Sequence, residues 1–180
     1  MATAPTKFWT IDDLDDLPDG RIEVCEGELR EMPASGSQHS AIAGNVLTAI
    51  NVFNRTTRLG IVTGEGGGYI LSRDPLVLLI PDVAFTRSSS EATPQIPEIA
   101  PDLVVEVVSP TDRMGDVDEK VAVYLASGVS IVWVVLPRRR VVKVHRAEEP
   151  GLAREFGVED TLDGGDVLPG FRLPVAEIFG

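Results

Sequence analysis

The feature that most constrains the fold is an apolar run at residues 101–110, which carries a single glutamate, Glu106. The run has the length of a strand, and its valine-rich composition is typical of a strand buried on both faces of a sheet. A carboxylate in such a strand costs free energy unless it is paired or binds a metal ion. Asp82 has a similar setting, because residues 76–80 and 83–85 around it are also apolar. We therefore expect two strands that each carry one acid in need of a partner.

The segments around these acids predict an α/β domain with a central sheet covered by helices. Residues 116–126 have the apolar spacing of a helix, and a continuous apolar run at 131–136 follows them. A helix between two such runs indicates a βαβ crossover with strands 102–108 and 131–136 parallel. Upstream, alternation over 21–32 predicts a hairpin, and an apolar stripe over 37–60 predicts a long helix.

Shorter patterns account for the remaining segments. Residues 10–20 predict a short helix with solvated acids. The glycine-rich stretch 64–68 lacks the lysine and serine or threonine of a phosphate-binding loop, so we interpret it as a turn between two short strands. The proline-containing stretch 88–101 predicts a surface loop. Residues 152–158 favour another strand, and 168–174 form a proline-punctuated segment before a short C-terminal turn.

Length and composition indicate one domain over residues 1–180, with residues 1–10 expected to be a flexible tail. The single cysteine, Cys25, allows no internal disulfide, which favours a reducing compartment. The N-terminus has no basic segment followed by a long apolar run, and the apolar runs are too short to span a bilayer. We therefore expect a cytoplasmic protein that does not enter a membrane.

The charge balance opposes nucleic-acid binding without excluding it. Acidic residues outnumber basic ones 28 to 16, which gives a formal net charge of −12. Nucleic-acid binders usually present a basic face, because neutralised phosphates supply much of their affinity. The basic residues do gather in two groups, which are equally well explained as solvated turns: Arg138, Arg139, Arg140, Lys143 and Arg146, and the smaller pair Arg55 and Arg58.

The two embedded acids and a following lysine predict metal-assisted phosphodiester hydrolysis. Magnesium prefers hard oxygen ligands, usually one or two carboxylates with retained waters and substrate phosphate. Asp82 and Glu106, on what we expect to be neighbouring strands, fit that ligand set. Lys120 lies 14 residues after Glu106, on the next predicted helix, where it borders the apolar stripe. An ammonium there can orient the attacking water or stabilise the charge that develops on the phosphate.

Each of these residues also has a structural explanation. Asp82 is suited to capping a turn after Pro81. Glu106 is suited to a buried ion pair with an arginine. Lys120 is suited to a surface pair with Asp116, four residues earlier on the same helix. Only the three residues taken together favour an enzyme over a structural protein.

Several short motifs resemble those of the Uma-two family, which belongs to the PD-(D/E)XK restriction-endonuclease-like superfamily. The resemblance covers roughly residues 10 to 180, and its motifs are specific in combination. They are Glu26-Gly27-Glu28-Leu29, Gln38-His39-Ser40, Pro81-Asp82-Val83-Ala84-Phe85, the run from Pro101 to Pro110, Asp116 with Lys120 and Tyr124, the run from Gly128 to Val135, and the segment from Leu168 to Pro174.

The resemblance implies a fold and a set of metal ligands. The fold is a restriction-endonuclease-like mixed central sheet flanked by helices, with an N-terminal hairpin and a C-terminal strand extension. Asp82 and Glu106 would be the superfamily's two acids, and the backbone carbonyl of Val107 would complete the metal shell. The superfamily's lysine normally lies two residues after the second acid. Val108 stands there, so the resemblance makes Lys120 on the following helix the catalytic lysine.

The resemblance also suggests auxiliary residues near the site, namely Glu28, His39 and Tyr124. Where family members commonly have a glutamate before the histidine, this chain has Gln38, so any acidic role at that position is lost.

The leading hypothesis is an endonuclease that depends on Mg²⁺ or Mn²⁺, cleaves double-stranded DNA and acts as a homodimer, because duplex cleavage needs one site per strand. Two alternatives stay open. The chain is also compatible with a catalytically inactive nuclease fold that serves as a binding or regulatory module, which the acidic charge favours. A small-molecule phosphodiesterase would use the same chemistry.

Overall fold

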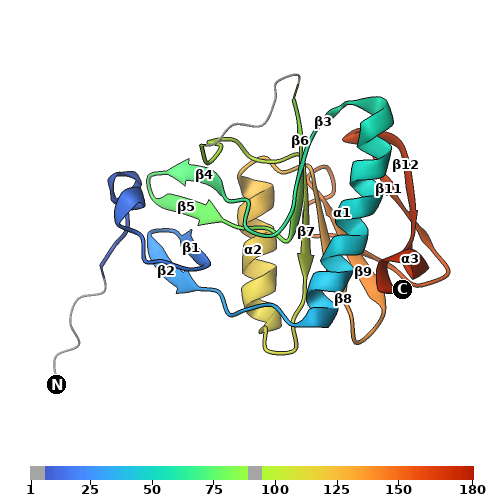
Figure 1. Cartoon of the computed structure of the whole chain (residues 1–180), viewed down its shortest axis with the longest axis horizontal. Coiled ribbons are helices and arrows are strands. Elements are labelled where there is room, and N and C mark those ends of the chain that lie inside the picture. The colour runs from blue at the N-terminus through green and yellow to red at the C-terminus, as the bar shows by residue number, and fades with distance from the viewer. Residues whose placement is uncertain (1–6, 89–94) are drawn as a thin grey trace.

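A computed structural model describes residues 7–88 and 95–180 (Figure 1). In chain order the elements are η1 (Ile11–Asp16), β1 (Ile22–Cys25), β2 (Glu28–Glu31), α1 (Ser37–Thr57), β3 (Gly60–Thr63), β4 (Tyr69–Arg73), β5 (Leu76–Leu79), β6 (Val83–Arg87), β7 (Leu103–Val107), α2 (Met114–Ala126), β8 (Ile131–Leu136), β9 (Val141–Arg146), β10 (Ala153–Phe156), β11 (Thr161–Gly164), β12 (Leu168–Pro174) and α3 (Val175–Phe179).

A mixed six-stranded sheet forms the centre, in the order β10-β9-β8-β7-β6-β3. The predicted crossover is confirmed, because β7 and β8 are parallel and α2 connects them. The other neighbouring strands of this sheet pair antiparallel. The near-continuous apolar sequences of β7 and β8 follow from this central position, since both faces of the two strands are covered.

Different elements cover the two faces of the central sheet (Figure 1). On one face, α1, α3 and the β11-β12 hairpin pack on alternate residues of the strands, including Val105 and Trp133. On the other face, α2 packs on the intervening residues, such as Val104 and Val132. Glu106 follows Val105 in β7, so the alternation of a strand turns its side chain toward α2.

A second sheet of four strands, in the order β2-β1-β5-β4, packs beside α2 and is called the hairpin sheet here. The predicted β1-β2 hairpin is confirmed and pairs Val24 with Leu29. Val77 and Leu79 of β5 join the apolar cluster that contains α2. Because β5 belongs to the hairpin sheet and β6 to the central sheet, residues 80–82 carry the chain from one sheet to the other. Asp82 therefore lies at the junction of the two sheets.

The structure refines several sequence expectations. α1 is confirmed, and α2 begins at Met114, two residues before the predicted start. The glycine-rich stretch 64–68 connects two strands as predicted, although β3 and β4 belong to different sheets. The sequence does not predict β11, which pairs with β12; β12 is the proline-punctuated segment 168–174 of the sequence analysis. Across the described residues, no helix is long and apolar enough to cross a membrane.

The expected flexible tail is described only in part. Residues 1–6 lie outside the described residues. Beyond them, the backbone N–H of Trp9 donates to the carbonyl of Gly27 at 2.8 Å, and Lys7 forms an ion pair with Asp13. These contacts hold residues 7–10 against the β1-β2 turn and η1.

Candidate active site

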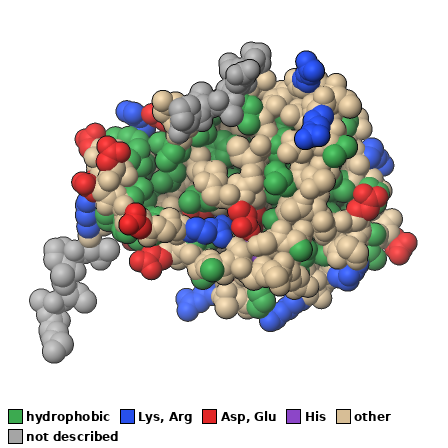
Figure 2. Space-filling model, in the orientation of Figure 1, with side chains coloured by type: hydrophobic (Ala, Val, Ile, Leu, Met, Phe, Trp, Pro, Cys, Tyr) green, Lys and Arg blue, Asp and Glu red, His purple; other side chains and the backbone are tan. Residues whose placement is uncertain are grey.

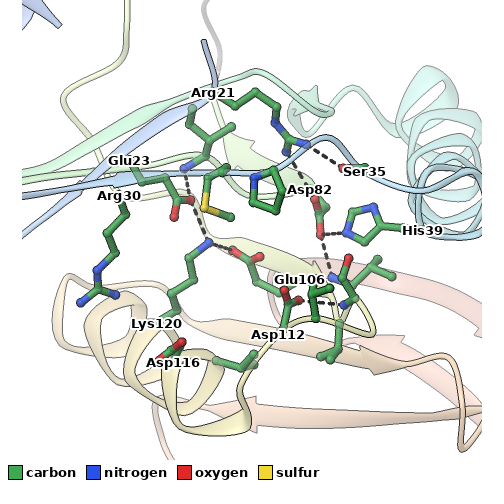
Figure 3. A pocket seen from close by; sticks show the side chains of 18 of the residues that line it. Arg21, Glu23, Arg30, Ser35, His39, Asp82, Glu106, Asp112, Asp116 and Lys120 are labelled. Atoms are coloured by element: carbon green, nitrogen blue, oxygen red, sulfur yellow. Dashed lines mark hydrogen bonds and ion pairs between the residues drawn. The ribbon is translucent and has the colours of Figure 1, made fainter. Parts of the chain in front are cut away.

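A cavity of about 640 Å³ lies between the hairpin sheet, the adjoining ends of β6 and β7, and the first turns of α1 and α2. Figure 2 shows acidic and basic side chains next to each other near the middle of this face. The charged and histidine side chains of the lining are Arg21, Glu23, Arg30, Glu31, His39, Asp82, Glu106, Asp112, Arg113, Asp116 and Lys120 (Figure 3). Six acids thus face four permanent cations, so the cavity carries an excess of negative charge that one divalent cation would balance.

Asp82 and Glu106 meet because of the register between β6 and β7. Val83 pairs with Val105 in this antiparallel pair, so continuing the register by one residue sets Asp82 opposite Glu106. Side chains directly opposite each other in an antiparallel pair lie on the same face. The two acids that the sequence analysis singled out therefore enter the same cavity from neighbouring segments.

Two donors fix the carboxylate of Asp82. Its Oδ2 accepts the backbone N–H of Val107 at 2.7 Å and lies 3.1 Å from Nε2 of His39. Its Oδ1 lies 3.9 Å from Arg21 Nη2 and accepts no hydrogen bond among the described residues. A metal ion in the cavity would therefore find Oδ1 free while Oδ2 holds the carboxylate in place.

The carboxylate of Glu106, like that of Asp82, is held through one of its two oxygens. Its Oε1 accepts a hydrogen bond from the Tyr124 hydroxyl at 2.7 Å and lies 3.6 Å from Lys120 Nζ. Within the described part of the chain, Oε2 has no hydrogen-bond partner. Burial raises the pKa of Glu106 to about 7; Lys120 opposes this shift, and the carboxylates of Asp82 and Glu23 add to it. The residues thus fit a hard divalent cation, because each acid offers one free oxygen.

Lys120 reaches the cavity from α2 and contacts two acids. Its Nζ donates to Oε1 of Glu23 at 2.8 Å and lies 3.6 Å from Oε1 of Glu106 (Figure 3). Burial lowers the pKa of Lys120, but the charges of Glu106 and Glu23 outweigh this effect and hold the pKa above its ordinary value. The ammonium is therefore charged at neutral pH and lies beside one of the two acids predicted to bind the metal.

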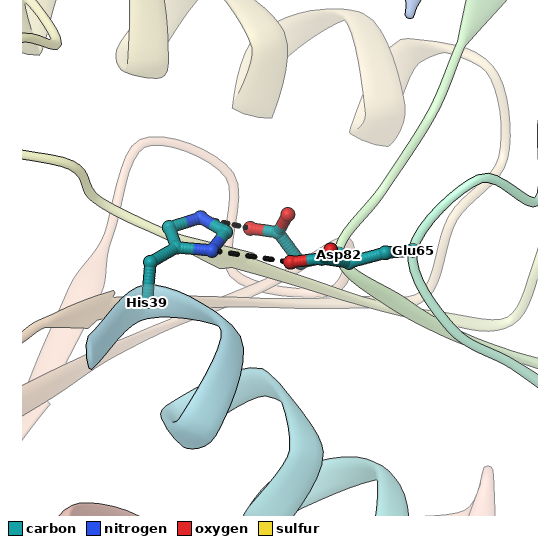
Figure 4. Close-up of side chains that lie close together, drawn as sticks. All are labelled: His39, Glu65 and Asp82. Atoms are coloured by element: carbon teal, nitrogen blue, oxygen red, sulfur yellow. Dashed lines mark ion pairs between the residues drawn. The ribbon is translucent and has the colours of Figure 1, made fainter. Parts of the chain in front are cut away.

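A second set of candidate ligands adjoins Asp82 on the opposite side (Figure 4). His39, Glu65 and Asp82 each offer a ligand atom within 4.8 Å of the others, and could together hold a metal ion. Nδ1 of His39 lies 3.3 Å from Glu65 Oε1 and is buried without a hydrogen-bond partner in the described residues. The hydrogen bond to Asp82, with further support from Glu65, raises the pKa of His39 against the opposing effect of burial.

Most residues of the predicted site thus converge on one cavity. Asp82, Glu106 and Lys120 line it, and His39 and Tyr124 hold the two acids. Glu28 is the exception. It is exposed on β2 beside the β1-β2 turn, whereas the opposite end of the hairpin faces the cavity, so its position does not support an auxiliary role.

The structural explanations considered for the single residues do not hold. Asp82 accepts its hydrogen bond from Val107 on β7 rather than from a turn after Pro81. The charged partner of Glu106 is Lys120, and no arginine pairs with it among the described residues. Likewise, no ion pair between Lys120 and Asp116 is found in the described ranges. The Val107 N–H has a defined role here, while metal binding by its carbonyl stays a prediction.

Sequence reasoning missed Glu23 and Glu65. Glu23 stands between Ile22 and Val24, an apolar setting like that of Glu106, and this signal was available. The alternation over 21–32 predicts a hairpin, and that pattern alone does not single out Glu23. Glu65 lies in the glycine-rich turn, where nothing in the local sequence distinguishes a ligand from a solvated acid.

The predicted basic clusters do not line the cavity. Arg139 and Arg146 are paired with Glu155 and Asp163, and Arg140 lies over the ring of Phe179. Arg139 and Arg140 lie in the β8-β9 turn and Arg146 lies in β9, which agrees with the interpretation of this cluster as a charged turn. The cations nearest the two acids are instead Arg21 and Lys120.

Comparisons with known proteins agree with this architecture. The Uma2 family model, described as "Putative restriction endonuclease", matches residues 10–176. A solved structure described as a "putative nuclease belonging to DUF820 from Anabaena variabilis" superposes with a TM-score of 0.82. The two sequences are 21% identical, and the match covers 94% of this chain and 97% of the other. This likeness supports the fold, including the mixed central sheet. No curated protein matches the chain.

Proposed function

Because the chain belongs to the Uma2 family, we propose that it is a nuclease that hydrolyses phosphodiester bonds of double-stranded DNA with the help of Mg²⁺ or Mn²⁺. The observation that carries the proposal is the convergence of two largely buried acids, Asp82 and Glu106, on one cavity, with the ammonium of Lys120 beside Glu106. An acid pair with free oxygens suits a divalent cation, and the adjoining ammonium suits a reaction in which negative charge develops.

Asp82 and Glu106 would hold the ion, with the carbonyl of Val107 as a third ligand. The bound ion would neutralise charge on the phosphate and lower the pKa of the attacking water. We favour this donor set over His39, Glu65 and Asp82 for Mg²⁺, because magnesium prefers oxygen ligands and the raised pKa of His39 favours a protonated ring. In this arrangement His39 and the Val107 N–H orient Asp82, and Tyr124 orients Glu106.

The basic residues of the cavity lining support a phosphodiester substrate, although acids outnumber them there. Arg21, Arg30 and Arg113 line the cavity together with Lys120. Arg21 donates from Nη1 to Ser35 and brings its guanidinium to 3.9 Å from Asp82, which suits a contact with a phosphate oxygen close to the ion. Each cavity would cleave one strand, so duplex cleavage would need two copies of the chain.

The decisive experiment is nicking of supercoiled plasmid in Mn²⁺, with wild type, Glu106→Ala and Glu28→Gln compared. We expect nicked circles with wild type and with Glu28→Gln, which removes an exposed carboxylate outside the cavity, and none with Glu106→Ala. Calorimetric titration with Mn²⁺ should show binding that Asp82→Ala abolishes. Cleavage by Glu106→Ala would mean that the site is misassigned. Metal binding without cleavage by any protein would favour the inactive nuclease fold that acts as a binding module.

A further inference from the structure

Glu23 is a fully buried acid whose role the proposed reaction does not explain. It lies in the middle of β1, its side chain is 0% exposed, and its neighbours in the chain are Ile22 and Val24. A carboxylate in such a place is costly unless it is hydrogen-bonded and paired. Glu23 belongs to the hairpin sheet, whereas Asp82 and Glu106 belong to the β6 and β7 segments and lie far from it in sequence.

Both donors to Glu23 reach the same oxygen. Oε1 accepts the backbone N–H of Ile80 at 2.9 Å and Nζ of Lys120 at 2.8 Å. Oε2 is buried and has no hydrogen-bond partner among the described residues. The Ile80 N–H therefore fixes the carboxylate at the junction of the two sheets, and the only cation that contacts it in the described residues is Lys120 (Figure 3).

The two acids around Lys120 contact it unequally. Its Nζ lies 2.8 Å from Glu23 and 3.6 Å from Glu106, so Glu23 is the closer partner. A divalent ion on Glu106 would weaken the attraction of that carboxylate for the ammonium, whereas the contact with Glu23 would persist. A lysine side chain has a flexible stem and loses considerable rotamer freedom when it is fixed. A lysine that extends from a helix to the sheet therefore needs an anchor that the metal does not occupy.

We propose that Glu23 is a positioning residue that holds the ammonium of Lys120 beside Glu106, independently of the metal ion. The proposal rests on the proposed function for its consequence in catalysis, but the contact itself can be tested in the absence of any reaction. The Glu23 side chain is 0% exposed and its Oε1 is engaged by Lys120 and Ile80, so we assign it no contact with substrate. It would act through the lysine alone.

The test is NMR of the lysine ammonium groups in ¹⁵N-labelled protein without metal. An ammonium held by a buried carboxylate exchanges slowly with water and gives an Nζ–H signal, which Lys120→Arg assigns by its disappearance. We expect this signal to be lost in Glu23→Gln and kept in Glu106→Gln. Glu119→Gln, which removes an exposed acid one residue from Lys120, is the matched control and should leave the signal unchanged. Backbone amide spectra report whether each variant is folded.

Two results would overturn the proposal, namely a signal that survives in Glu23→Gln or one that is lost only in Glu106→Gln. If Glu23→Gln does not fold, Glu23→Asp replaces it, because the shorter side chain keeps the charge and withdraws it from Nζ; an unchanged signal there would equally refute the proposal.

With plasmid as substrate, we expect Glu23→Gln to lower kcat by about 10- to 100-fold, with KM and the Mn²⁺ Kd changed by less than about 2-fold. An inactive wild type with the expected NMR pattern would refute the proposed function alone.

Discussion

The two groups of residues around the acid pair use similar side chains in different ways. The lysine side consists of Glu23, Glu106, Lys120 and Tyr124, and the histidine side of His39, Glu65 and Asp82. On the lysine side, a permanent cation serves two acids, and the charged side chains are 0% to 13% exposed. On the histidine side, the cation exists only when His39 is protonated, and the outer acid, Glu65, is 34% exposed. The lysine side is thus a closed buried charge network, while the histidine side opens to solvent.

This difference predicts a ranking of stability effects, because a buried charge that loses its partner costs more than an exposed one. Asp82 lies where the two sides meet, so variants elsewhere are the cleaner way to compare them. The predictions that follow run from the largest expected effect to the smallest.

Removal of the lysine charge should have the largest effect. Lys120→Met leaves the fully buried Glu23 without its counter-charge, so we expect the free energy of unfolding to fall by about 3 to 5 kcal/mol. Urea denaturation followed by circular dichroism measures the change. The double variant Glu23→Gln/Lys120→Met should regain a large part of the loss. Arg30→Met, which breaks an ion pair between exposed partners, should cost less than about 1 kcal/mol. Equal losses in the two single variants would contradict the ranking.

The stability of the metal-free protein should fall as pH rises from about 5 to 7. Burial raises the folded-state pKa of Glu106 to about 7, above the ordinary glutamate value of 4.5, so the folded protein binds more protons than the unfolded chain across this interval. A shift of this size corresponds to about 3 kcal/mol in the free energy of unfolding. The raised pKa of His39 changes stability in the same direction, because the stabilisation that the protonated ring contributes is lost as pH rises through its folded-state pKa.

Variants separate these two sources of pH dependence. Urea denaturation at several pH values should give a much flatter profile for Glu106→Gln, and a smaller change of slope for His39→Gln. Saturating Mn²⁺ should reverse the trend in wild type, since the metal competes with the proton for Glu106. If the stability of the metal-free protein rises with pH, and does so equally in Glu106→Gln, then burial does not raise the pKa of the Glu106 carboxyl.

The smallest effect is expected for Glu65→Gln. Because Glu65 is 34% exposed, we expect less than about 1 kcal/mol of lost stability. The Mn²⁺ Kd should change by less than about 3-fold if Asp82 and Glu106 hold the ion, and by about 10-fold or more if His39, Glu65 and Asp82 hold it. Calorimetric titration distinguishes these outcomes, with Asp82→Asn as the variant that should lose binding in either case.

The parts of the fold and site that the sequence predicted share one physical origin, namely strongly apolar strands. β7 and β8 were recognisable because they are buried on both faces, and the cost of burying Glu106 in β7 marked it as a candidate site residue. The parallel crossover then located Lys120 on the helix that packs over Glu106. These inferences need only local sequence and the general geometry of βαβ units.

The parts that were missed depend on contacts between distant segments. Glu23 occupies a four-residue strand, in which a buried acid and the solvent face of a hairpin give the same alternation. Its burial results from the packing of α2 beside the hairpin sheet, which no local pattern reveals. Glu65 lies between β3 and β4, which belong to different sheets, and its approach to His39 is a contact that local sequence does not show. β11 is short and contains one buried large apolar residue, Leu162, so its strand pattern is weak.

The contact between Glu23 and Lys120 joins residues 97 positions apart, and this separation has a consequence for the order of folding. During synthesis the hairpin sheet emerges from the ribosome well before α2. If that sheet packed on the central strands early, Glu23 would enter the interior with no counter-charge. We therefore expect the hairpin sheet to dock together with α2 or after it, and nascent chains that end before Lys120 to leave β1 open to proteases.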